Sequence, residues 1–233
     1  MRAFVAAALR VGSADPDDVE GFLADAVSAS LAGQPEVARQ VFEALLPPVM
    51  ECAIDLGHDE LLGEVLSELD ACAAHYLLSV YRTTSPDARP EALDEASWAA
   101  AELGFLPRPL AAMEAALGGE LPGLDAFLPG WIARLRRVGA RERYPRSEWI
   151  HEAIARHGGT RALADEARRT RSYGDLTAWV DAVQEGGDAA ATRRAAEEAA
   201  ALSDDASRRA GFLDPVAAAS AALGEGRVLS DRE

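Results

Sequence analysis

Both cysteines and half of the histidines lie within one stretch of 24 residues, as Cys52, His58, Cys72 and His75. Zinc prefers four tetrahedral nitrogen or sulfur ligands, which sequences commonly supply as two closely spaced pairs. Cys72-x-x-His75 could form one pair on a helix, whereas five residues and an expected helix end separate Cys52 from His58. Each cysteine also falls on an apolar helical stripe, as small core residues do. We therefore predict reduced, buried cysteines and no metal, and these four residues are the candidates if a metal does bind.

Two carboxylate–histidine pairs have the spacing of di-iron helical bundles, namely Asp55-x-x-His58 and Glu148-x-x-His151. That chemistry requires both pairs to project into a bundle core. Glu148 and His151 instead share a polar helix face opposite Trp149, so we expect them to be solvated. A metal-dependent α-helical enzyme that uses carboxylates and histidines is kept as the alternative function.

All 23 basic residues are arginine, because the chain contains no lysine. A side-chain Schiff base and a P-loop of the usual type both require lysine. Gly-x-Ser-x-Gly and Gly-x-Gly-x-x-Gly are also missing from the sequence. These observations predict neither catalytic residues nor a bound cofactor.

Arginines are concentrated at the end of one expected helix and in the segment that follows it. A solvated face that covers Trp131 and Leu135 is one interpretation. A docking site for an acidic protein segment is another, and a phosphate-bearing ligand such as RNA is a third. We take the docking site as the functional hypothesis, with the partner-binding residues Arg134, Arg137, Arg141, Arg143, Arg146 and Tyr144.

The net charge of −16 is distributed unevenly. Residues 1–107 hold 5 arginines and 19 acidic residues, whereas residues 131–171 hold 11 arginines and 5 acidic residues. Overall acidity argues against non-specific nucleic-acid binding, which needs a positive field. The asymmetry indicates complementary surfaces that could meet within one molecule or across a homodimer.

The composition favours an all-α fold. Alanine, the strongest helix former, makes up about a fifth of the chain, and runs of β-branched residues are missing. A helix-boundary phrase at 33–45 recurs at 57–69: a glycine closes one helix, a polar residue or proline opens the next, and apolar residues follow at helical spacing. The repetition predicts stacked antiparallel helix pairs.

Apolar residues at helical spacing from Val19 to Ser30 predict a helix that Asp15 or Asp17 could cap and that Gly33 ends. A partner helix is expected from Pro35 to Leu46, where Pro47-Pro48 breaks it and starts another through Leu56. Later expected helices cover 59–81, 91–103, 109–117, 147–157, 160–171 and 189–202, and apolar residues from Phe127 to Val138 mark another. The Gly-rich connector 118–123 suggests a division into an acidic half, 1–117, and an Arg-rich half, 124–222, followed by a frayed tail, 223–233.

A second phrase recurs in the C-terminal part, where a tryptophan early in a helix precedes a Gly-Gly pair. Trp149 comes before Gly158-Gly159, and Trp179 comes before Gly186-Gly187. The pairs over 15–70 and 147–202 resemble tetratricopeptide-like or HEAT-like helical repeats, in which small residues such as Ala167 pack closely. The resemblance implies an α-solenoid-like, all-α fold of about ten helices.

We therefore predict a non-catalytic interaction module or scaffold with a protein partner. The chain could also be one helical segment of a larger multidomain protein. No apolar stretch approaches the roughly 18–20 residues that span a bilayer. Two cysteines do not make a disulfide framework, and the apolar Ala3–Leu9 segment looks like a first helix, so a cytoplasmic location without membrane contact is expected.

Overall fold

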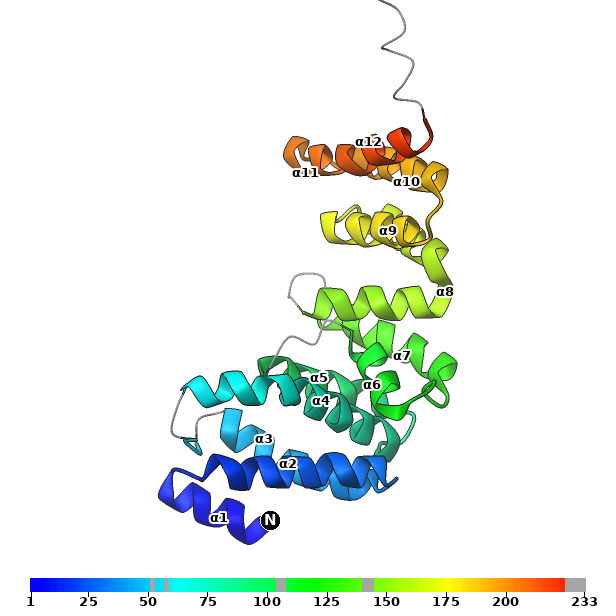
Figure 1. Cartoon of the computed structure of the whole chain (residues 1–233). Coiled ribbons are helices and arrows are strands. Elements are labelled where there is room, and N and C mark those ends of the chain that lie inside the picture. Colours follow the sequence, from blue (N-terminus) through cyan, green and yellow to red (C-terminus); the bar gives the residue numbers. More distant parts are fainter. Residues whose placement is uncertain (51–52, 57–58, 104–107, 140–144, 225–233) are drawn as a thin grey trace, which may run out of the picture. The chain divides into compact units, whose positions relative to one another are not determined.

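The computed structural model describes residues 1–50, 53–56, 59–103, 108–139 and 145–224. Within these ranges the chain forms helices α1 to α12 and no sheet (Figure 1), and an isolated bridge pairs Ser13 with Asp55. The predicted all-α fold class is therefore confirmed. Among the same residues, none of the helices combines the length with the apolar character that a bilayer crossing requires.

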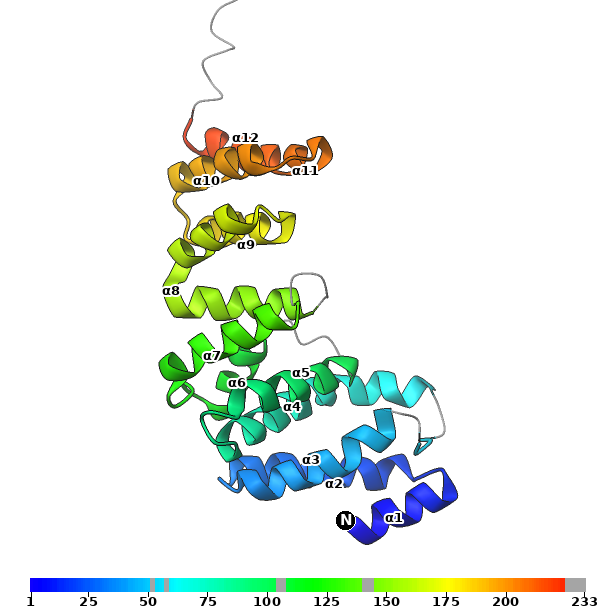
Figure 2. The same ribbon diagram turned by 180° about the vertical axis from the view of Figure 1, so that it is seen from behind.

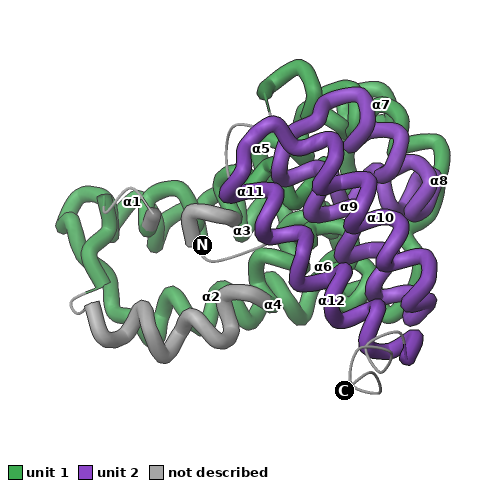
Figure 3. The backbone as a smooth tube through the Cα atoms, turned by 90° about the horizontal axis from the view of Figure 1, so that it is seen from above, with its two compact units in different colours: residues 1–150 green, residues 151–233 purple. Residues whose placement is uncertain are grey.

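Contacts divide the chain into two compact units, residues 1–150 and residues 151–233 (Figure 3). Unit 1 contains α1 (Arg2–Val11), α2 (Pro16–Leu31), α3 (Pro35–Met50), α4 (Asp59–Thr83), α5 (Arg89–Leu103), α6 (Pro109–Leu117), α7 (Leu124–Arg137) and the start of α8 (Arg146–Thr170). Unit 2 contains the remainder of α8, α9 (Tyr173–Glu185), α10 (Ala189–Leu202), α11 (Ala206–Gly211) and α12 (Leu213–Ala222).

The first helix pair forms where its boundary residues predict it. The Asp15 side chain caps α2 by accepting the Asp17 backbone N–H, and Pro16 occupies the first helical turn. Gly33 adopts a left-handed φ of 75° before Pro35 opens α3. The apolar face predicted for α2 is directed to the core, with four buried members: Val19, Leu23, Ala26 and Ser30.

The helices from α2 to α5 run back and forth in antiparallel order, and α5 and α7 run parallel (Figures 1 and 2). α5 and α7 show the parallel relation in their contacts. A Cβ placed on Gly130 would lie 3.1 Å from Pro90, and one turn further along both helices Arg134 bonds to Asp94. These relations agree with the predicted plan of stacked antiparallel helix pairs.

Two local expectations for unit 1 were wrong. Pro47 and Pro48 do not end α3, which continues to Met50. Each proline forfeits the hydrogen bond that its N–H group would make to the carbonyl four residues earlier, and α3 ends two residues after Pro48. Residues 53–56 do not form a helix, because the backbone of Asp55 donates to Gly12 and accepts from Ala14 between α1 and α2.

The boundary between the two units lies C-terminal to the Gly-rich connector 118–123. Gly118 and Gly123 both have a φ of 71°, and they make a turn between α6 and α7. Contacts cross this turn, because the Tyr81 hydroxyl donates to the Pro122 carbonyl at 3.0 Å and the Tyr81 ring meets Phe127 edge-on at 5.2 Å. The connector therefore lies within unit 1, and the division at 150/151 falls inside α8.

Unit 2 begins with a helical hairpin that interrupts α8. Gly158 and Gly159 have non-helical backbone angles, and the φ of 64° and ψ of −160° at Gly159 are accessible only to glycine. The predicted end at the Gly-Gly pair is therefore confirmed. Asp188 caps α10 by accepting the Ala191 N–H at 3.0 Å, and α10 covers the predicted range, 189–202. The tryptophan that precedes the second Gly-Gly pair, Trp179, is buried.

Candidate functional site

Two arginines of the predicted surface converge on one buried carboxylate in unit 1. Arg134, in the last turn of α7, donates from Nε to Oδ2 of Asp94 at 3.0 Å. Arg146, the first residue of α8, donates from Nε to Oδ1 at 2.9 Å. Asp94 is only 1% exposed, and each of its two carboxylate oxygens forms an ion pair with an arginine.

The neighbours of Asp94 on α5 complete this anchor. Glu91 accepts a second hydrogen bond from Arg134, at 3.0 Å to Nη1. The guanidinium of Arg146 lies 4.4 Å from the ring centroid of Trp98, a cation–π contact. We call Asp94, Glu91, Trp98, Arg134 and Arg146 the Asp94 anchor. It fastens the end of α7 and the start of α8 to the same helix.

The anchor changes the interpretation of the predicted partner-binding residues. The side chains of Arg134 and Arg146 are only 19% and 14% exposed, so their charges are largely used within the fold. Arg137 is exposed in the last turn of α7. The other three predicted residues, Arg141, Arg143 and Tyr144, lie outside the described residues. Partner binding by this set stays a prediction.

The segment between the two anchoring arginines carries a concentrated positive charge. Residues 135–145 contain four arginines and a single glutamate, a balance of +3. The guanidinium group offers donors in a planar fork that matches a carboxylate or a phosphate. We call residues 135–145 the Arg-rich segment. Its two ends are fixed by ion pairs to the same carboxylate.

The two described members of the predicted cysteine and histidine cluster are buried core residues. Cys72 and His75 are both buried in α4. The Nδ1 atom of His75 lies 3.0 Å from the hydroxyl of buried Ser30 on α2, and burial lowers the pKa of this imidazole. Cys52 and His58 lie outside the described residues. Across the part of the chain that the structure describes, no three His, Cys, Asp or Glu side chains gather into a set that could hold a metal ion.

A buried polar cluster in unit 2 was missed by the sequence reasoning. Nε2 of His151 lies 2.7 Å from Oδ1 of Asp175, which is 3% exposed. Hydroxyl groups of Thr170 and Ser172 donate to Oδ2 of Asp175 at 2.5 and 2.8 Å. His151 was expected to be solvated and is only 11% exposed, because its partner comes from another helix. Glu148 is exposed, as expected.

The local signal for this cluster was present at the start of α9. Ser172-x-x-Asp175 is a capping-box pattern, and the Ser172 side chain accepts the Asp175 N–H as the N-cap. Burial acts to raise the pKa of Asp175, but hydrogen bonds from His151, Thr170 and Ser172 outweigh it and hold this pKa well below its usual range. The cluster therefore keeps a charged carboxylate inside the protein.

The geometry of this cluster differs from that of a Ser–His–Asp triad. In a triad the hydroxyl is bonded to the imidazole, which accepts its proton. Here the hydroxyls of Thr170 and Ser172 donate to Asp175, on the oxygen away from His151. The cluster joins α8 to α9, and it does not activate a nucleophile.

Comparisons of the chain with models of known protein families, with curated proteins and with solved structures give no significant match. Functional inference therefore depends on the residues and contacts described above.

Proposed function

We propose that this protein is a non-catalytic helical interaction module that binds an acidic protein segment through the Arg-rich segment, 135–145. The observation that carries the proposal is the Asp94 anchor. Arg134 and Arg146 bind the two oxygens of one buried carboxylate, so both ends of the segment are fixed relative to α5. Fixing the ends reduces the conformational entropy that the segment loses when a partner binds.

The charge of the Arg-rich segment defines the chemistry of its partner. A balance of +3 over eleven residues attracts carboxylates in spite of the acidic chain as a whole. Arg137 supports this role, because it is exposed in the last turn of α7, whereas Trp131 and Leu135 of the same helix are buried. The acidic region 1–107, from the same chain or from a second copy, is the first candidate partner.

The polar clusters support a non-catalytic role. His75 is paired with Ser30, His151 is paired with Asp175, and Asp94 holds two guanidinium groups. Each set joins two or three helices, as a scaffold requires. The helix pairs further support a solenoid-type module of the tetratricopeptide-like or HEAT-like kind, and the low cysteine content supports a cytoplasmic location.

A peptide-binding experiment tests the proposal. Fluorescence anisotropy would measure binding of labelled Asp- and Glu-rich peptides, including residues 15–25 of this chain, at low and moderate salt. The variant Arg137→Glu/Arg141→Glu/Arg143→Glu should bind at least about tenfold more weakly and with a smaller salt dependence, because it removes three positive charges whose attraction to the peptide is screened by salt.

A charge-matched control separates local from overall charge. Arg2→Glu/Arg82→Glu/Arg161→Glu makes the same change in net charge at exposed positions elsewhere. It should keep most of the affinity. Equal losses in the two variants, or failure of every acidic peptide to bind the unmodified protein at low salt, would contradict the proposal.

A further inference from the structure

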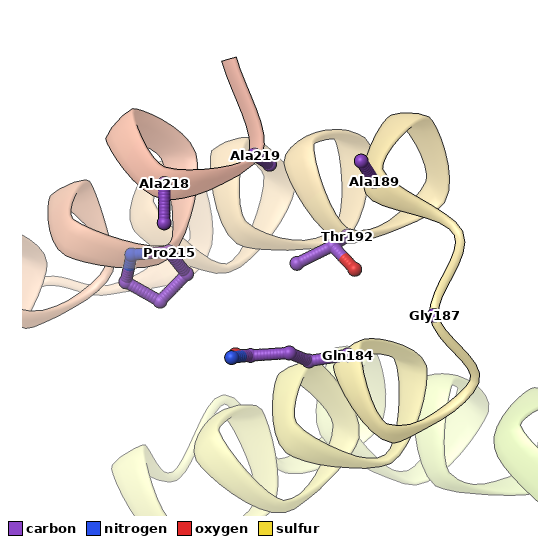
Figure 4. Close-up of a pocket in the computed structure, with 7 residues that line it drawn as sticks. All are labelled: Gln184, Gly187, Ala189, Thr192, Pro215, Ala218 and Ala219. Atoms are coloured by element: carbon purple, nitrogen blue, oxygen red, sulfur yellow. The ribbon is translucent and has the colours of Figure 1, made fainter. Parts of the chain in front are cut away.

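Unit 2 contains an open pocket of about 190 Å³ between α9, α10 and α12 (Figure 4). None of the described residues that line it is charged, and the Thr192 hydroxyl in its wall already donates to the Asp188 carbonyl. The pocket therefore has no group that selects a ligand by its charge. The Asp94 anchor of unit 1 does have such a group, because one of its arginines binds a carboxylate at the surface.

Arg134 binds two carboxylates of α5 that differ strongly in their exposure. Its Nε atom donates to Asp94, which is 1% exposed, and its Nη1 atom donates to Glu91, which is 66% exposed. Glu91 and Asp94 are three residues apart on α5 and lie on the same face of this helix. Arg134 therefore has an inner contact, to Asp94, that solvent does not reach, and an outer contact, to Glu91, at the surface.

The outer contact can be replaced by another carboxylate. An exposed ion pair contributes little free energy, because water solvates each charge well when the pair separates. Glu91 can move into solvent without leaving a buried charge unpaired, whereas Asp94 cannot. Nη1 belongs to the outer edge of the guanidinium group, and a carboxylate that binds this edge as a fork contacts both Nη atoms. An incoming carboxylate that binds in this way has to take the place of Glu91.

Arg137 continues the outer edge of Arg134 along α7. It comes three residues after Arg134, in the last turn of the helix, and it is exposed. Residues three apart are neighbours on a helix surface. Two carboxylates of one acidic segment can therefore contact Arg134 and Arg137 together.

We propose that Glu91 occupies the place of a partner carboxylate, and that a bound partner replaces Glu91 on the outer edge of Arg134. Arg134 then holds Asp94 through Nε and the partner through its Nη atoms, and Arg137 binds a second carboxylate of the partner. This inference rests on the proposed function, because the partner is the acidic segment named there.

Competition by Glu91 makes the site selective for segments with several carboxylates. Glu91 belongs to the same chain as Arg134, so its effective concentration at the site is high, and a ligand with one carboxylate competes poorly with it. A segment with two or more carboxylates gains the contact to Arg137 as well and displaces Glu91.

Peptide binding to two charge-matched variants tests the competition. Glu91→Gln and Glu95→Gln each remove one exposed negative charge from α5, and Glu91 is the one that pairs with Arg134. In the anisotropy assay with the peptide of residues 15–25, Glu91→Gln should bind about two- to fivefold more tightly than the unmodified protein, the factor that an exposed ion pair contributes. Glu95→Gln should raise the affinity by less than about 1.5-fold, through screened attraction alone.

The Nε–H signal of Arg134 reports on the site directly. This proton is bonded to buried Asp94, so it exchanges slowly with water and should be visible in a nitrogen–proton NMR spectrum. The peptide should shift this signal more than that of Arg146, which also pairs with Asp94 but has no contact with Glu91 and serves as the internal reference. Acetate, which has a single carboxylate, should shift the Arg134 signal in Glu91→Gln and leave it in place in the unmodified protein.

Separate outcomes decide the inference and the proposed function. If the peptide binds but Glu91→Gln and Glu95→Gln gain affinity equally, or if binding leaves the Arg134 signal in place, Glu91 is not a competitor and the inference is overturned, while the proposed function stands. If acetate shifts the Arg134 signal of Glu91→Gln but no acidic peptide binds either protein, the outer edge is a carboxylate site and the proposed acidic partner is wrong. If neither acetate nor the peptide has an effect on Glu91→Gln, both are wrong.

Discussion

His151 and Asp175 are joined by a 2.7 Å contact between Nε2 and Oδ1, which links α8 to the start of α9. Asp175→Asn would leave mismatched donors from His151, Thr170 and Ser172 around a neutral amide. We expect the free energy of unfolding to fall by about 1–3 kcal/mol, the usual cost of unsatisfied buried polar groups. Urea unfolding followed by circular dichroism measures the change.

The same variant should alter the response to acid. Because the folded-state pKa of Asp175 is lowered, its contribution to stability is complete above the unfolded value of 3.8 and is lost as the pH falls below it. The difference between wild type and Asp175→Asn should therefore narrow from pH 6 to pH 3. The control Asp204→Asn, at an exposed position, should change stability by less than about 0.5 kcal/mol. A constant difference across this pH range would contradict the assignment.

Signals within a few residues of each other predicted the helices well, whereas the candidate site is formed by contacts between residues that are far apart in the sequence. Asp15 and Gly33 mark helix ends through hydrogen bonds and backbone angles within a few residues, so the sequence alone places them. Arg134 looked like a surface residue because its partner, Asp94, is forty positions away on another helix. Helical periodicity shows which residues lie on the same face of a helix, but it does not show which other helix packs against that face. His151 was misjudged for the same reason.

The Asp94 anchor should contribute strongly to the stability of unit 1. Asp94→Asn removes a charge that faces two largely buried guanidinium groups, Arg134 and Arg146. Breaking a buried ion pair in this way costs about 3–5 kcal/mol. Glu95→Gln removes an exposed charge at the next position of α5 and is the matched control. Differential scanning calorimetry should show a lower melting temperature for Asp94→Asn alone, and equal effects would mean that the ion pairs are not a principal support.

Buried His75 should make unit 1 sensitive to mild acid. Its pKa is lowered by burial, so the folded state takes up protons less readily than the unfolded state. The stability contribution is complete above the ordinary value of 6.5 and is lost as the pH falls below it. Wild type should therefore lose stability between pH 7.5 and pH 5.5 in urea titrations. His75→Gln should reduce this slope, whereas His157→Gln, at an exposed position, should preserve it. An unchanged slope in His75→Gln would place the sensitivity elsewhere.

Gly159 and Gly21 should respond to alanine in opposite directions. Gly159 adopts a φ of 64° and a ψ of −160° inside α8, so Gly159→Ala imposes strain of about 1–3 kcal/mol. Gly21 lies within α2 and has no positive φ, and a Cβ placed on it would meet no atom within 4 Å. Gly21→Ala should therefore stabilise the helix by about 0.5–1 kcal/mol, because alanine loses less backbone entropy on folding. Chemical unfolding of the two variants in the same buffer measures both signs. Equal tolerance of alanine at Gly159 would show that α8 can continue as one helix through the Gly-Gly pair.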